Sequence, residues 1–123
     1  MQSVVATVLV ALVALAHAWV LVLDMFLWEK PLGLKTFRNT PEKAALTAVL
    51  AKNQGLYNGF LVAGLLWGIS RVYSDAGDGQ AIETFFLGCV VVAGAYGAAT
   101  VSRSIFFVQA VPALVALAAV WLS

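Results

Sequence analysis

Four long apolar runs, separated by polar connections, set the hydrophobic pattern of this 123-residue chain. The runs cover residues 3–28, 45–72, 81–101 and 104–122. Each approaches or exceeds the ~20 residues that a helix needs to cross ~30 Å of hydrocarbon. The pattern predicts an all-α polytopic membrane protein, a four-transmembrane-helix bundle that forms one domain over residues 1–123. The first run is longer than a signal-peptide core of ~7–15 residues, so it is interpreted as a retained helix.

The polar connections carry local signals for where helices begin and bend. Thr40, Pro41 and Glu42 combine a capping hydroxyl, a proline suited to a first turn and an acid that the helix dipole favours. The second helix is therefore predicted to begin near Pro41. The segments SDAGDGQ and VSRS are read as the second and third turns. Within the last run Pro112 lacks an amide donor, which predicts a kink close to Gln109.

Composition supports the membrane class. The chain is 63% hydrophobic and 11% charged, with a mean hydropathy of +0.96, whereas soluble domains carry roughly 25% charged residues. A net charge of +1 gives no indication of nucleic-acid binding. The single cysteine, Cys89, excludes an intrachain disulfide and a CxxC metal or redox site, and it is interpreted as a packing residue.

The basic residues are distributed unevenly between the connections. Those of the first and third connections are Lys30, Lys35, Arg38, Lys43 and Arg103. The second connection is flanked by Arg71, which lies close in sequence to three acids. Because cytoplasmic loops are enriched in Lys and Arg, the first and third connections are predicted to be cytoplasmic, with both termini outside the cytoplasm.

The stretch NQGLYNGF, residues 53–60, interrupts the second run with polar groups. At ~100° per residue Asn53 and Tyr57 share one helix face, and Gln54 and Asn58 share the next. Unsatisfied amides are costly in hydrocarbon, so these groups must face protein or water. Two interpretations stay open: hydrogen bonds that join helices, and a ligand-facing pocket. GxxxG pairs at 55/59 and 64/68 predict close helix contacts.

The first run supplies a matching polar stripe of His17, Asp24 and Trp28, spaced by seven and four residues. Histidine is a plausible proton carrier near neutral pH, and intramembrane ionisable groups usually face a bundle interior. His17 and Asp24 lie ~10 Å apart along the helix, so a water, ligand or amide would have to bridge them. Alternatively, His17 makes an interhelical hydrogen bond and Asp24 meets water or Lys30. One histidine without HxxxH or ExxH spacing argues against a metal site.

Tyr96 in the third run and Gln109 in the fourth complete the candidate set. Estimated depths bring polar groups from all four runs into the cytoplasmic half of the bundle. We therefore expect His17, Asp24, Tyr57 and Gln109 to border one cavity.

Three segments together resemble a known family: AHAWVLVLDMFLW, NQGLYNGFLVAGLLWG and GAYGAATVSRSIFFVQAVPAL. They are similar to the small bacterial membrane proteins of the domain of unknown function 1304 family, over nearly the whole chain. That family's pattern of a histidine, an acid seven residues later and a tryptophan matches His17, Asp24 and Trp28, although the acid is usually Glu. The resemblance implies a multi-pass protein of the cell inner membrane and a shared motif, with no assigned activity.

Taken with the polar groups, this favours an integral membrane protein with a polar intramembrane pocket that binds or isomerises a small lipophilic molecule by proton shuttling. A cofactor-free isomerase or cyclase is the enzyme class that such groups would suit. The predicted catalytic residues are His17, Asp24 and Tyr57. The predicted ligand-binding residues are Trp28, Asn53, Gln54, Asn58, Tyr96 and Gln109.

No nucleotide, haem or flavin motif indicates a cofactor, and no metal is expected. The expected partners are membrane lipid and the small molecule, and a homo-oligomer is compatible with the pattern. Two alternatives remain. One is a small proton-coupled multidrug-type exporter, because four helices with one acid in the first are typical of that class. The other is a structural membrane protein whose polar residues only join helices.

Overall fold

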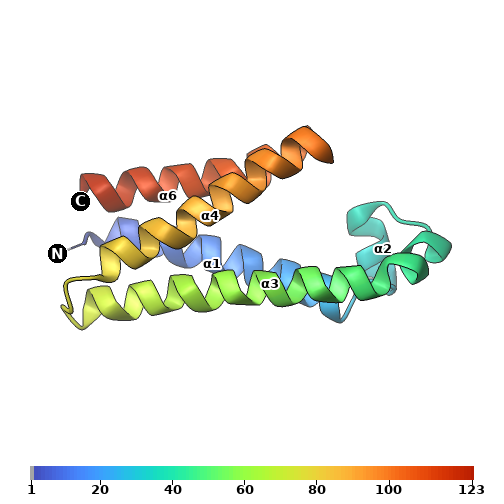
Figure 1. Ribbon diagram of the computed structural model, residues 1–123, viewed down its shortest axis with the longest axis horizontal. Helices are drawn as coiled ribbons and strands as arrows, with labels where there is room; N and C mark the ends of the chain where they lie inside the picture. The colour runs from blue at the N-terminus through green and yellow to red at the C-terminus, as the bar shows by residue number, and fades with distance from the viewer. Residues whose placement is uncertain (1) are drawn as a thin grey trace. The chain divides into compact units, whose positions relative to one another are not determined.

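The computed structural model describes residues 2–123, and almost all of them are helical. Six α-helices and one π-helical turn follow one another in this part of the chain, without a strand (Figure 1). The predicted all-α class is confirmed. The chain divides into two compact units, described separately below: residues 15–62, and the chain up to Ala14 combined with residues 63–123.

Three helical stretches are long and apolar enough to cross a membrane: α1 (Val4–Met25), α4 (Gly79–Thr100) and Arg103–Leu122. They match three of the four predicted runs. The fourth run lies in α3 (Pro41–Tyr73), a helix of 33 residues. Within residues 2–123, α3 is not one of the three candidate spans, because Lys43, Lys52 and the NQGLYNGF stretch lower its mean hydropathy. The membrane class therefore rests on three candidate spans.

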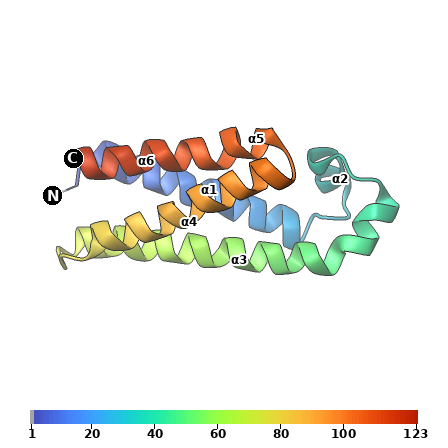
Figure 2. The ribbon, with the colours of Figure 1, turned by 45° about the horizontal axis from the view of Figure 1, so that its top comes forward.

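In the unit of residues 15–62, the connection after α1 contains a short helix, α2 (Pro31–Phe37), that the sequence did not predict. Pro31 stands in its first turn, where a missing amide hydrogen costs nothing. Gly33 is buried on the end of α1, where an added Cβ would overlap the carbonyl of Leu27. The helix ends at Phe37 and is capped by Arg38, whose φ of 55° turns the chain so that the N–H of Asn39 donates a 2.9 Å hydrogen bond to the carbonyl of Leu34. Figure 2 shows α2 between the end of α1 and the start of α3.

The start of α3 confirms the predicted helix boundary. The helix begins at Pro41, and the Thr40 hydroxyl accepts a 3.2 Å hydrogen bond from the Lys43 N–H. Glu42 lies in the first turn, where a negative charge complements the helix dipole. A local capping signal therefore fixed this boundary.

In the other unit, α4 runs beside the last helical stretch, which comprises α5 (Arg103–Ile105), η1 (Phe106–Ala110) and α6 (Val111–Leu122) (Figures 1 and 2). Gly94 permits the close approach, because an added Cβ would lie 2.8 Å from the backbone nitrogen of Ala110. The Trp121 indole donates a 2.9 Å hydrogen bond to the hydroxyl of Thr84. The two helices thus form a closely packed pair.

The irregularity predicted near Gln109 takes the form of the π-helical turn η1, in which Gln109 lies. The N–H of Val111 donates to the carbonyl of Phe106, five residues earlier. Pro112 follows directly and has no amide hydrogen to continue the regular ladder, which accounts for a wider turn at this point.

The same unit contains the last part of α3 and the turn after it. Gly64 contacts the ring of Phe86, and Gly68 lies against Glu83, so the second GxxxG pair makes the predicted close contact. Arg71 binds Asp78 through two hydrogen bonds of 2.8 and 2.9 Å. These bonds hold the pKa of Asp78 below its usual value. The charges of Arg71 and Asp78 therefore compensate each other at this turn.

Candidate functional site

Asp24 is a buried carboxyl in the last turn of α1, with 6% of its surface exposed. One of its oxygens accepts a 3.3 Å hydrogen bond from the side-chain amide of Asn58 on α3. The helices approach closely here because Gly55 has no side chain: an added Cβ would lie 3.0 Å from the Asp24 Cβ and would overlap Met25. The structure thus brings together two predicted site residues, Asp24 and Asn58, over a glycine of the first GxxxG pair.

His17 lies two turns before Asp24 on α1 and is 5% exposed. It is not without an interaction partner. Seven residues of helix separate the two groups by ~10 Å along the axis. His17 is therefore an enclosed group. Its predicted proton exchange with Asp24 would have to pass through an intermediate.

Asn53, Gln54 and Tyr57 are exposed on α3. Tyr57 is 59% exposed, and its ring lies 5.9 Å from that of Phe60. Asn53 and Tyr57 are each two residues from Gly55, about 200° around the helix, so they lie opposite the face that contacts α1. Within residues 2–123 the side-chain amides of Asn53 and Gln54 make no hydrogen bond. We call these three residues the amide row.

Asn58 connects the buried carboxyl to the amide row. Its side-chain nitrogen lies 3.3 Å from an Asp24 oxygen and 3.2 Å from the backbone carbonyl of Gln54. Asn58 therefore contacts both the buried carboxyl and the backbone at Gln54.

The indole of Trp28 is bound within the protein. It donates to the carbonyl of Ala44 at 3.1 Å and to the hydroxyl of Thr47 at 3.2 Å. Its ring also packs on Phe37, with centroids 5.0 Å apart. Trp28 therefore joins the connection after α1 to the start of α3. The spacing of His17, Asp24 and Trp28 in the sequence did not predict this role.

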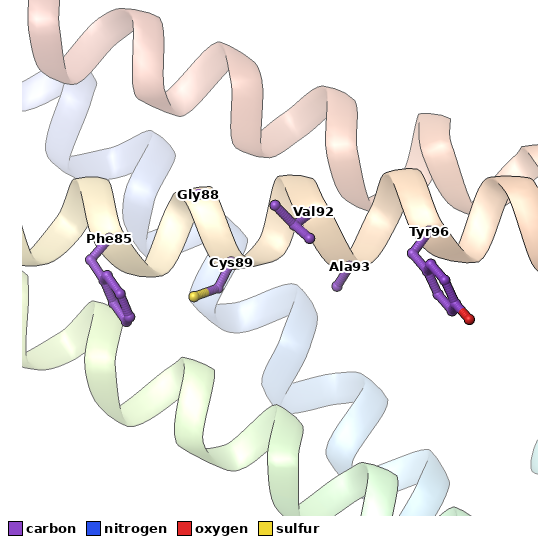
Figure 3. A pocket seen from close by; sticks show the side chains of 6 residues that line it. All are labelled: Phe85, Gly88, Cys89, Val92, Ala93 and Tyr96. Atoms are coloured by element: carbon purple, nitrogen blue, oxygen red, sulfur yellow. The ribbon is translucent and has the colours of Figure 1, made fainter.

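The remaining predicted residues lie in the other unit. Tyr96 is 72% exposed on α4, whereas Gln109 is half-buried in η1 and has an interaction partner. Tyr96 and Cys89 help to line a shallow apolar surface on one side of α4, together with Phe85 and Gly88. Figure 3 shows the Phe85, Cys89 and Tyr96 side chains projecting from the same side of that helix. The single cavity expected to join His17, Asp24, Tyr57 and Gln109 stays a prediction.

Glu83 is a buried carboxyl that the sequence interpretation missed. It is 0% exposed and accepts a 3.3 Å hydrogen bond from the Gln2 amide. Among residues 2–123 the second oxygen of Glu83 and the amide oxygen of Gln2 are buried and have no hydrogen-bond partner. The available signal was the position of Glu83 inside the apolar run of residues 81–101. No group of His, Cys, Asp and Glu suited to a metal ion occurs in the described part of the chain.

Comparison with known proteins places most of the chain in one family. The model of the family described as "Protein of unknown function (DUF1304)" matches residues 11–121. The match spans both units and every candidate residue named above, so the chain belongs to this family. No curated protein and no solved structure matches the chain.

Proposed function

We propose that this member of the DUF1304 family is an integral membrane protein that binds a small lipophilic molecule at the amide row of α3. The observation that carries the proposal is the row itself: two amides without a hydrogen bond in the described chain and an exposed phenol, on the same helix as Asn58, which bonds the buried carboxyl of Asp24. Polar groups in a spanning segment are costly unless they have partners. A ligand with a polar end would supply them.

The proposal takes α3 as a fourth spanning helix. Residues 53–70 contain no charged side chain, and at 1.5 Å per residue they extend ~27 Å, close to the ~30 Å of a hydrocarbon core. Lys52 and Arg71 flank this segment. The amide row then lies near one edge of the bilayer, a depth suited to a ligand whose polar group stays at the interface. The connection charges support an inner-membrane orientation with both termini outside the cytoplasm.

Binding is better supported than isomerisation. A general acid or base must come within ~3 Å of the proton that it moves. His17 and Asp24 are enclosed, and Asp24 already accepts a bond from Asn58. Of the three proposed catalytic groups, Tyr57 is the one that is exposed on the row. Proton shuttling would therefore begin at Tyr57 and would need the other two to become accessible.

A structural role is the second candidate function. Two observations favour it: the Asp24–Asn58 bond and the bonds of the Trp28 indole are all made within the protein. These residues join α1 to α3 whatever the amide row binds. The amide row and the residues that join α1 to α3 can therefore be tested separately.

The test is mass spectrometry of small molecules that co-purify with the protein in mild detergent. Tyr57→Phe, combined with Asn53→Leu, removes hydrogen bonds to the ligand and should lower its retention about tenfold. Tyr73→Phe is the matched control, because Tyr73 is a similarly exposed tyrosine at the far end of α3. Unchanged retention in the double variant, or equal loss in the control, would refute binding at the row.

A further inference from the structure

The connection between α1 and α3 concentrates unpaired positive charge. Residues 29–52 hold five of the seven basic side chains of the protein but two acids, Glu29 and Glu42. All five basic residues are exposed: Lys30, Lys35, Arg38, Lys43 and Lys52. In the described chain the ion pair is Arg71–Asp78, and none of these five side chains forms one.

Large apolar side chains are exposed among these charges. Leu32 on α2 and Leu46, Val49 and Leu50 on α3 each expose nearly half of their surface or more, up to 86% for Leu46. Exposed leucines do not suit water, and exposed lysines do not suit hydrocarbon. The mixture suits the interface of a membrane, where apolar side chains enter the acyl boundary and cations meet phosphates.

The segment is also held in a defined conformation. Gly33 packs on the backbone of Leu27, and the Trp28 ring packs on Phe37 at the end of α2. The indole of Trp28 is bonded to Ala44 in the first turn of α3. The cations are thus presented by a folded connection that begins directly after the spanning helix α1.

We propose that this connection binds the head groups of anionic phospholipids in the membrane that the protein spans. Charge complementarity supports this occupant: five unpaired cations face a layer of phosphates, and the adjacent leucines can anchor the segment in the same layer. The position supports it as well, because Lys30 follows the end of α1 by five residues. Tryptophan at such a boundary is typical of side chains at head-group depth. This inference does not depend on the proposed ligand of the amide row.

The experiment titrates phosphatidylglycerol, and phosphatidylcholine as a neutral reference, onto the full-length protein in detergent and counts bound lipids by native mass spectrometry. Phosphatidylglycerol should bind more tightly, and salt should weaken its binding. Each cation near an anionic surface contributes roughly fivefold in affinity, so Lys30→Gln/Lys35→Gln should weaken phosphatidylglycerol binding about thirtyfold. Glycerol phosphate added alone should not compete, because it lacks the acyl chains.

The charge-matched control is Arg71→Gln/Arg103→Gln, which also removes two cations but leaves the connection intact. It should bind phosphatidylglycerol nearly as well as the wild-type protein. Equal binding of the two lipids by the wild-type protein would overturn the proposal without any variant. Equal weakening in both double variants would also overturn it, since net charge alone would then explain the effect. Preferential binding of an acidic polypeptide or of single-stranded nucleic acid by Lys30 and Lys35, without a lipid preference, would point to a different partner.

Discussion

Asp24 and Glu83, one in each unit, are buried carboxyls with closely similar surroundings. Each packs against a glycine of α3, Asp24 on Gly55 and Glu83 on Gly68. Each accepts one 3.3 Å hydrogen bond from a side-chain amide. The two carboxyls differ in where their amide partners lie and in how many of their oxygens have a hydrogen-bond partner. Asp24 lies in the last turn of α1, and its amide partner lies on another long helix. Glu83 bonds to Gln2, which precedes α1, and its other oxygen has no partner in the described part of the chain.

The comparison separates close packing from hydrogen bonding. A glycine lets a polar residue approach a helix, and an amide then satisfies part of its hydrogen-bonding capacity. The Asp24 arrangement uses two elements of regular structure and connects to the amide row. Within residues 2–123 the Glu83 arrangement leaves two buried acceptors without donors, so loss of its one hydrogen bond should cost more than loss of the Asp24–Asn58 bond. The three changes below test this difference.

The largest effect is expected from closing the glycine contacts. In Gly68→Ala the new Cβ would lie 3.0 Å from the Glu83 backbone nitrogen, which cannot move independently. Overpacking of this kind costs about 1–3 kcal/mol of unfolding free energy. Gly55→Ala should cost less, because its worst contact is with the flexible Met25 side chain. Thermal unfolding in detergent, followed by circular dichroism, would rank them.

Gly88→Ala is the control for these glycine variants. An added Cβ there meets nothing within 4 Å. Alanine also favours helix over glycine by about 1 kcal/mol, so this variant should be neutral or more stable. If Gly88→Ala were as destabilised as Gly68→Ala, contact with the buried carboxyl would not be the cause of the loss.

Removing the amide partners should have an intermediate effect. Gln2→Leu leaves Glu83 fully buried without its donor and should cost about 1–2 kcal/mol, while Asn58→Leu should cost about 1 kcal/mol. Replacing both members, as in Gln2→Leu/Glu83→Leu, should recover much of the loss, since neither polar group is then left alone. A double variant less stable than Gln2→Leu would mean that Glu83 has a further role. Equilibrium unfolding in mixed detergent would measure these differences.

The smallest effect is expected on the exposed side of α3. Asn53→Leu should change the unfolding free energy by less than about 0.5 kcal/mol, because its amide makes no hydrogen bond in the described chain. Asn58→Leu is the internal reference, since it removes the same chemical group from the face that contacts Asp24. Similar losses at the two positions, in the same unfolding assay, would indicate that the amide row also joins helices.

The sequence predicted features that depend on neighbouring residues. Thr40 and Pro41 marked the start of α3 because capping uses groups within one turn. Pro112 indicated an irregular helix because the missing donor is a property of the residue itself. The glycine pairs predicted close contacts for the same reason, since the absence of a Cβ is visible without knowledge of the partner.

The sequence could not predict features that depend on distant partners. Helix α2 was missed because its Gly33 is stabilised by the end of α1 and not by its own seven residues. The indole of Trp28 shares a stripe with His17, but its donor is taken by the carbonyl of Ala44. The burial of Glu83 was missed because its partner, Gln2, lies 81 positions away in the chain.

The π-helical turn η1 has a consequence for the alignment of the last helical stretch. A bond spanning five residues in place of four adds one residue to a turn, so the positions before it are rotated by about 100° relative to a regular helix. Ile105, just ahead of η1, contacts Gly97, while Ala110 at its end contacts Gly94. A single-residue deletion inside residues 106–110 would restore the regular bonding pattern and turn one of these two contacts away from α4. The extra residue in η1 therefore lets Ile105 and Ala110 both face α4.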